Sequence, residues 1–183
     1  MNLHLLRNTP TIAIYYDSWN NWLFADWQGE LTLASVQVAC LELAQCVLQR
    51  PYARVLNSNA QVTTTQWEVA TWLAQDFLPF LTLAGIEKLA WVCAPSLRGR
   101  NLAYTISHRL PAVQLALFDE LDEAVSWLQQ RPGEYASGCG LPLRPAAAQR
   151  QLARAVQQFG QLLHIGALGP GQAEPPQPQQ PGS

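Results

Sequence analysis

A chain of 183 residues can form one domain with a hydrophobic core but is too short for two comfortable domains. Hydrophobic residues make up 49% of the chain and charged residues 13%, which excludes a chain that is disordered throughout. The net charge of −2 and the single lysine, Lys88, supply no basic patch, so general nucleic-acid binding is not expected.

The terminal and cysteine patterns favour a cytoplasmic protein. Residues 1–7 lack the charged and apolar regions of a signal peptide, and no stretch reaches about 18 uninterrupted apolar residues, so no membrane span is expected. The four cysteines, Cys40, Cys46, Cys93 and Cys139, form no Cys-x-x-Cys pair. We therefore expect them to be small core residues in a reducing compartment, with no metal site.

The first elements predicted are the two strands of a β-hairpin. Residues 11–16 and 21–27 are rich in β-branched and aromatic side chains, and residues 17–20 between them are typical of a turn. Residues 1–10 are expected to be an N-terminal arm that precedes this hairpin.

A helix is predicted over residues 32–49. Apolar residues recur there at the spacing of one helical face, and Pro51 stops the helix because proline has no amide hydrogen to donate. The residues of this face are Leu33, Val36, Cys40, Leu43 and Val47.

A short strand, a polar loop and a second helix are predicted next. Residues 54–57 are apolar until their end, as in a buried strand, and the polar residues 57–64 are expected to form a loop. Thr65 and Glu68 have the spacing of a capping box, in which the threonine hydroxyl accepts from an early helix amide while the glutamate reaches back. The second helix is therefore expected to begin at Thr65 and to end at Gly85.

Strands and helices continue to alternate after the second helix. Residues 86–93 form the apolar run of a central strand, Ser96 can cap a third helix that reaches His108, and residues 113–118 form another strand. Asp119 can cap a fourth helix. This order predicts an α/β fold: a single, mainly parallel sheet with an N-terminal β-hairpin and about four helices.

The alternating pattern stops after Pro132. The domain is therefore expected to cover residues 11–131. Residues 132–165 are expected to be a linker in which residues 146–163 can form an isolated amphipathic helix, and residues 166–183 a disordered tail rich in proline and glutamine. We expect these last two segments to contribute little to core stability.

Four blocks of the alternating core carry a resemblance to a known family. They are residues 15–27, 55–59, 89–96 and 117–128. On these blocks the chain resembles the small bacterial STAS-like proteins, which are similar in fold to the anti-sigma-factor antagonists. The resemblance implies a STAS-like fold and a non-catalytic regulatory or protein-interaction domain with a protein partner.

The same resemblance points to one modification site. In the better-known members of the family, a serine at the start of the helix after the third strand is phosphorylated. The matching place here holds Asn57, Ser58 and Asn59. Ser58 is therefore the candidate phosphoacceptor, and an ordinary turn serine that bonds its own backbone is the alternative.

Polar residues that follow two neighbouring strands form the candidate binding surface. Asn57, Ser58 and Asn59 follow one strand, and Ser96 and Arg98 follow the next. Because the carboxyl ends of parallel strands lie at one edge of a sheet, we expect these five residues to form one surface suited to an acidic partner or an anionic ligand. For Arg98, a solvated helix face is the alternative.

The aromatic residues and histidines bear on the class of function. Most of the seven tryptophans are expected in the core, with Trp19 and Trp72 on an interaction surface. Binding of a small apolar molecule or a lipid between the second and third helices is the alternative function. His4, His108 and His164 occur in different settings and no catalytic motif is present, so neither an enzyme activity nor a cofactor is expected.

Overall fold

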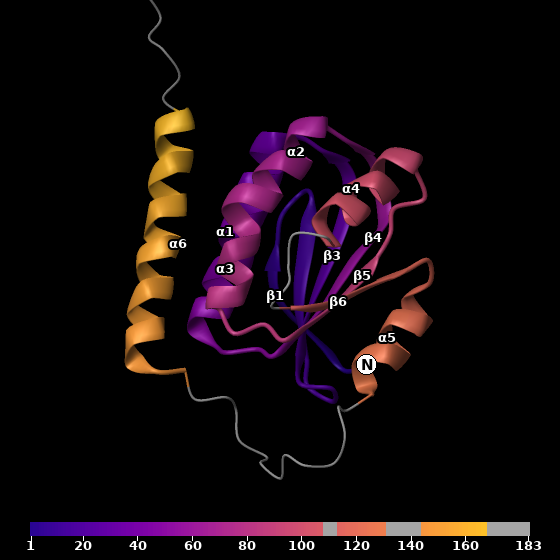
Figure 1. Cartoon of the computed structure of the whole chain (residues 1–183), viewed down its shortest axis with the longest axis horizontal. Coiled ribbons are helices and arrows are strands. Elements are labelled where there is room, and N and C mark those ends of the chain that lie inside the picture. Colours follow the sequence, from indigo (N-terminus) through magenta and orange to yellow (C-terminus); the bar gives the residue numbers. More distant parts are fainter. Residues whose placement is uncertain (108–112, 131–143, 168–183) are drawn as a thin grey trace, which may run out of the picture.

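The computed structural model describes residues 1–107, 113–130 and 144–167. A six-stranded sheet lies at its centre, with the strands in the order β1-β2-β3-β4-β5-β6 (Figure 1). The strands are β1 (Leu3–Asn8), β2 (Ile12–Asp17), β3 (Trp22–Leu31), β4 (Arg54–Thr65), β5 (Lys88–Val92) and β6 (Gln114–Phe118). The helices are α1 (Leu33–Gln49), α2 (Trp67–Trp72), α3 (Leu78–Leu83), α4 (Leu97–Ser107), α5 (Leu121–Gln129) and α6 (Ala146–Ala167), and a π-helical turn, η1 (Leu73–Phe77), joins α2 to α3.

The strand directions confirm the predicted fold class. β1, β2 and β3 pair antiparallel, whereas β3, β4, β5 and β6 pair parallel. Each parallel pair is joined by a helical crossover, as connections between parallel strands require. The fold is therefore an α/β fold whose single sheet is mostly parallel after its N-terminal antiparallel strands.

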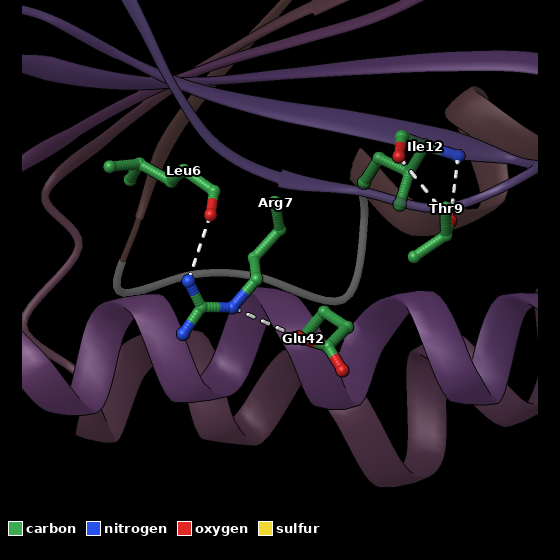
Figure 2. A network of polar contacts seen from close by, with 5 residues as sticks. All are labelled: Leu6, Arg7, Thr9, Ile12 and Glu42. Atoms are coloured by element: carbon green, nitrogen blue, oxygen red, sulfur yellow. Dashed lines mark hydrogen bonds and ion pairs between the residues drawn. The ribbon is translucent and has the colours of Figure 1, made fainter.

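Residues 1–10 are not a free arm, because they contain the edge strand β1. The Ser18 amide donates to the carbonyl of Asn2, just before the strand. At the other end of the strand, Arg7 Nε lies 3.2 Å from Glu42 Oε2 of α1. Figure 2 shows this ion pair together with the turn in which the Ile12 amide donates to Thr9 Oγ1. The strand is short and open to solvent on one side, so its sequence shows little hydrophobic alternation.

Helix α1 matches its prediction closely. Val36, Cys40, Leu43 and Val47 of the predicted face are buried against the sheet. The helix begins with a capping box made by Thr32 and its N3 residue Ser35, since the Ser35 amide donates to Thr32 Oγ1 at 3.2 Å and the Thr32 amide donates to Ser35 Oγ at 3.1 Å.

Strand β4 corrects the predicted loop and capping box. It continues through residues 57–64 to Thr65, so the expected polar loop is strand. Helix α2 begins only at Trp67, and its N-cap Gln66 makes no side-chain capping bond. The reason lies in pairing with a distant strand: Thr65 is opposite Leu31 of β3, and the Gln66 amide donates to the Leu31 carbonyl. β-branched threonines suit such a strand well.

The second predicted helix is divided into three parts. η1 widens the helix between α2 and α3 and ends two residues before Pro79, which has no amide hydrogen to donate into an α-helical turn. Gly85 ends the segment with φ of 80°, a left-handed conformation that favours glycine. The predicted end of this helix is therefore confirmed.

Helices cover the two faces of the sheet unequally. α1, α2–α3 and α4 cover one face, and α5 covers the other (Figure 1). The smaller cluster, on the α5 side, contains Trp22, Phe24, Leu56, Ala90, Val92, Ala124 and Leu128. α5 has Glu120 as its N-cap without a side-chain bond, so the expected cap at Asp119 is wrong; Asp119 pairs with Arg100 of α4 at 2.8 Å.

Helix α6 packs against α1 and α3, outside the main layer (Figure 1). Leu152 is 0% exposed and belongs to the main core. Arg144, just before the helix, donates to the carbonyls of Val47 at 3.1 Å and Ala84 at 2.8 Å. The expectation of an isolated helix is therefore wrong, because its apolar face has a partner on α1 and α3. The rest of the expected tail, residues 168–183, lies outside the described residues.

Candidate functional site

A cavity lies between the sheet and the helices of the larger layer. The cavity has a volume of about 40 Å³, and the space between its lining residues amounts to about 550 Å³ when the solvent at its opening is included. Its lining residues are Trp27, Leu31, Val36, Cys40, Leu43, Val55, Asn57, Asn59, Val69, Leu73, Phe77, Leu78, Leu81, Leu89, Trp91 and Leu102. The wall is therefore apolar and aromatic, apart from a few polar groups on the strands.

Strand alternation places those polar groups. Asn57 and Asn59 are two residues apart in β4, so their side chains share the face that lines the cavity. Trp27 Nε1 donates to Asn57 Oδ1 at 2.8 Å, and Asn57 Nδ2 donates to Asn59 Oδ1 at 3.2 Å. This chain of hydrogen bonds satisfies the buried Trp27 and fixes the orientation of both amides.

Trp91 is the second indole of the cavity and has a different environment. It lies opposite Asn57 in the register of β4 and β5, and it is 6% exposed. Its buried Nε1 has no hydrogen-bond partner among the described residues. An indole nitrogen can only donate, and leaving a buried donor unpaired costs about 1–3 kcal/mol. The ring of Trp91 lines the cavity, whereas its nitrogen is an unpaired donor that is itself buried.

Cys40 is the one titratable residue among those that line the cavity. Burial raises the pKa of its thiol well above the usual range. The thiol therefore stays protonated at neutral pH and is a poor nucleophile. Among the described residues, no three His, Cys, Asp or Glu side chains group as a metal site would require.

Ser58 lies on the opposite face of the sheet from its two neighbours. It is 3% exposed, inside β4, and its hydroxyl is hydrogen-bonded to the carboxylate of Asp26. The expected position, an exposed turn at the foot of a helix, is therefore wrong. The prediction missed it because the strand continues for seven residues after Ser58, as the residue numbers of β4 show.

The other two predicted site residues belong to α4. Ser96 Oγ accepts from the Gly99 amide at 3.1 Å, so it caps this helix as expected. Arg98 lies in the first turn of the helix, and its side chain is outside what the structure describes. Of the five residues predicted as one surface, the structure thus brings only Asn57 and Asn59 together in the cavity.

The exposed tryptophans differ in part from the prediction. Trp19 is 77% exposed, as expected. Trp72 instead lies under α6, with its ring 6.5 Å from that of Phe159 and 6.1 Å from that of Phe77. Trp67, one of the tryptophans expected mostly in the core, is 72% exposed. Its position at the very start of α2 explains the difference, because the helix begins two residues later than predicted.

Comparisons with known proteins yield a likeness in fold. No family model matches the chain, and no curated protein matches it either. Among solved structures, it is similar to the crystal structure of an uncharacterized protein from the DUF3478 family with a SpoIIAA-like fold from Shewanella loihica PV-4. The sequences are 14% identical, the match covers 67% of this chain and 98% of that chain, and the TM-score is 0.42.

Proposed function

We propose that the chain is a non-catalytic, STAS-like domain that binds a small apolar molecule in the cavity between its sheet and α1, α2–α3 and α4. The observation that carries the proposal is the cavity itself, a space of about 40 Å³ that is lined by apolar and aromatic side chains apart from Asn57 and Asn59. Protein interiors are otherwise packed with few voids larger than a water molecule. Ligand sites, by contrast, are concave, mostly apolar and equipped with a few polar groups.

The position of the cavity supports the same function. Its asparagines lie in the first half of β4, level with the carboxyl end of β5, and the carboxyl ends of parallel strands in open α/β sheets are where ligands commonly bind. An apolar ligand gains dispersion contacts there with Leu73, Phe77 and Leu89, which otherwise face unfilled space.

Ethylbenzene is a suitable first probe, because it is small, apolar and free of hydrogen-bonding groups. A ligand at ten times its Kd stabilises the folded state by about 1.4 kcal/mol. For a chain of this size, that corresponds to a rise in Tm of roughly 3–6 °C. We expect such a rise in the unaltered protein, measured by circular dichroism.

A pair of matched variants localises the effect. Leu73→Phe adds volume inside the cavity and should abolish the rise in Tm. Leu128→Phe adds the same volume in the cluster beneath α5, away from the cavity, and should preserve it. No rise in the unaltered protein, or an equal rise in both variants, would contradict the proposal.

A protein-interaction role, expected from the STAS-like resemblance, is the second candidate. The exposed rings of Trp19, at the β2–β3 turn, and Trp67, at the start of α2, favour it. Exposed aromatic side chains are enriched at interaction surfaces. Trp19→Ser and Trp67→Ser should each leave the fold intact and should each reduce the amount of partner protein retained from lysate. Retention of the same protein by both variants and by the unaltered protein would contradict a role for these two surfaces.

A further inference from the structure

We infer that the cavity selects neutral molecules that carry a hydrogen-bond acceptor, such as small ketones, aldehydes or esters, and that the side-chain amide nitrogen of Asn59 is the donor that binds the acceptor. This inference rests on the proposed function, because it names the chemical class of ligand for the same cavity. It adds a polar contact that a purely apolar cavity would not make.

The direction of the hydrogen bonds in the cavity wall is set by Trp27. An asparagine amide has nearly the same shape in its two orientations, so its partners decide which orientation is stable. The indole nitrogen of Trp27 can only donate, so Asn57 must turn its Oδ1 toward that nitrogen, at 2.8 Å. Asn57 Nδ2 then faces Asn59 and requires an acceptor, which is Asn59 Oδ1 at 3.2 Å. The chain of donors and acceptors therefore ends on Asn59 Nδ2.

Asn59 Nδ2 is the unengaged end of this chain of hydrogen bonds. It can donate, but it donates to no residue in the described part of the protein, although Asn59 is only 3% exposed. Among the described residues, the side-chain nitrogens that are buried without a partner belong to Trp22, Arg50 and Trp91. Asn59 Nδ2 is not one of them, so it retains surface that a small molecule can reach. Because Asn59 lines the cavity, a ligand acceptor placed there would satisfy this donor.

The other polar groups of the described wall leave this role to Asn59. Asn57 uses both its oxygen and its nitrogen within the chain of hydrogen bonds. The nitrogen of Trp91 is itself buried, so its ring lines the cavity and its nitrogen does not. The thiol of Cys40 is a weak donor. The free polar group that a ligand meets is thus an amide N–H, which favours a ligand with a carbonyl oxygen.

The lining also determines the charge of the ligand. None of the described residues that line the cavity has a side chain that is charged at neutral pH, since burial raises the pKa of the Cys40 thiol. An ionised ligand would lose its hydration without gaining an opposite charge, which is strongly unfavourable in an apolar surrounding. The site therefore excludes acids and amines that are ionised at neutral pH and accepts their uncharged analogues.

Acetophenone and ethylbenzene test the donor, because they share a carbon skeleton and differ by one carbonyl oxygen. The quantity to measure is the ratio of their Kd values, by calorimetry, in the unaltered protein, in Asn59→Leu and in Ser58→Ala. Leucine is similar in shape and has no donor, so Asn59→Leu should weaken acetophenone relative to ethylbenzene by roughly three- to tenfold. Ser58→Ala should leave the ratio unchanged, because it removes a buried hydrogen-bonding group from the adjacent position of β4, on the opposite face of the sheet.

The outcomes separate this inference from the proposed function. An unchanged ratio in Asn59→Leu, with both molecules still bound, overturns the donor role and leaves the cavity as a site for apolar ligands. An equal change of the ratio in Ser58→Ala overturns the donor role too, because the effect would not come from the cavity face. If neither molecule binds the unaltered protein, the proposed function falls and this inference falls with it. Benzoate should bind about tenfold or more weakly than acetophenone, and equal binding would overturn the exclusion of charge.

A measurement on the unaltered protein covers the case in which Asn59→Leu does not fold. The side-chain amide protons of Asn59 should lie further downfield in the NMR spectrum with acetophenone bound than with ethylbenzene bound, because only acetophenone accepts a hydrogen bond from them. The comparison removes the effect of the phenyl ring, which the two molecules share. Resonances at the same position with both molecules overturn the inference.

Discussion

The pKa values of two aspartates, the half-buried Asp26 and the buried Asp17, are shifted in opposite directions by their surroundings. Burial raises the pKa of Asp26, and the hydrogen bond from Ser58 only partly opposes it. For Asp17 burial also acts to raise the pKa, but hydrogen bonds from the Asn20 side chain and from the amides of Asn2 and Trp19 outweigh it, so the pKa is lowered. The two carboxylates should therefore affect stability in opposite directions.

Asp26→Asn should stabilise the protein at pH 7. Because the folded pKa of Asp26 is above its unfolded value of 3.8, the ionised form is favoured less in the folded chain than in the unfolded chain. The resulting cost is present above the folded pKa and disappears as the pH falls below about 3.8. Urea unfolding should give a higher free energy of unfolding for the variant than for the unaltered protein at pH 7, and this difference should become smaller toward acid pH.

Asp17→Asn is the matched control for this prediction. The lowered pKa of Asp17 means that its ionised form contributes stability above pH 3.8, and that this contribution is lost as the pH falls through the folded pKa. The control should therefore lose stability at pH 7. Equal losses in both variants would show that the environment of Asp26 does not penalise its charge.

At the scale of elements, the sequence predicts what depends on neighbouring residues and misses what depends on distant ones. α1 follows from the spacing of Val36, Cys40 and Leu43 along one segment. The capping-box pattern at Thr65 and Glu68 is equally local, but pairing of Thr65 with Leu31 of β3 overrides it. No local pattern reports that a strand more than thirty residues earlier is available to pair.

In the candidate site, too, only the features that depend on neighbouring residues could be predicted from the sequence. Asn57 and Asn59 were predicted to bind a ligand as loop residues, and they line the cavity instead because alternation along β4 turns both to one face. Trp91 was predicted only as part of a buried strand. Neither the cavity beside it nor the lack of a partner for its Nε1 can be read from an apolar run, because both depend on how four helices pack over the sheet.

Helix α6 provides a direct test of packing between distant elements. Leu152 is fully buried in the main core, so Leu152→Ala should destabilise the protein by about 2–5 kcal/mol through lost burial and the cavity left behind. Gln151→Ala, one position earlier and exposed, should change the free energy of unfolding by less than about 0.5 kcal/mol. Urea unfolding measures both. Equal effects would mean that α6 does not dock as described.

At the scale of the whole molecule, the sheet separates two clusters of apolar side chains. Leu152 of α6 belongs to the larger cluster, and Leu128 of α5 belongs to the smaller one on the other face. Both helices are also tied to the centre by polar contacts: Arg144 bonds the ends of α1 and α3, and Lys88 Nζ of β5 donates to the Gln130 carbonyl at 2.9 Å. One sheet thus supports both layers.

This arrangement predicts a single cooperative unit that includes α6. Leu128→Ala and Leu152→Ala remove buried atoms on opposite faces and share no contacts within their clusters, so their costs should add to within about 0.5 kcal/mol in the double variant. The double variant should still unfold in one transition, with coincident curves from circular dichroism and tryptophan fluorescence. A first transition that is shifted only by Leu152→Ala, and a second shifted only by Leu128→Ala, would instead make α6 a separate unit that leaves the sheet before the core unfolds.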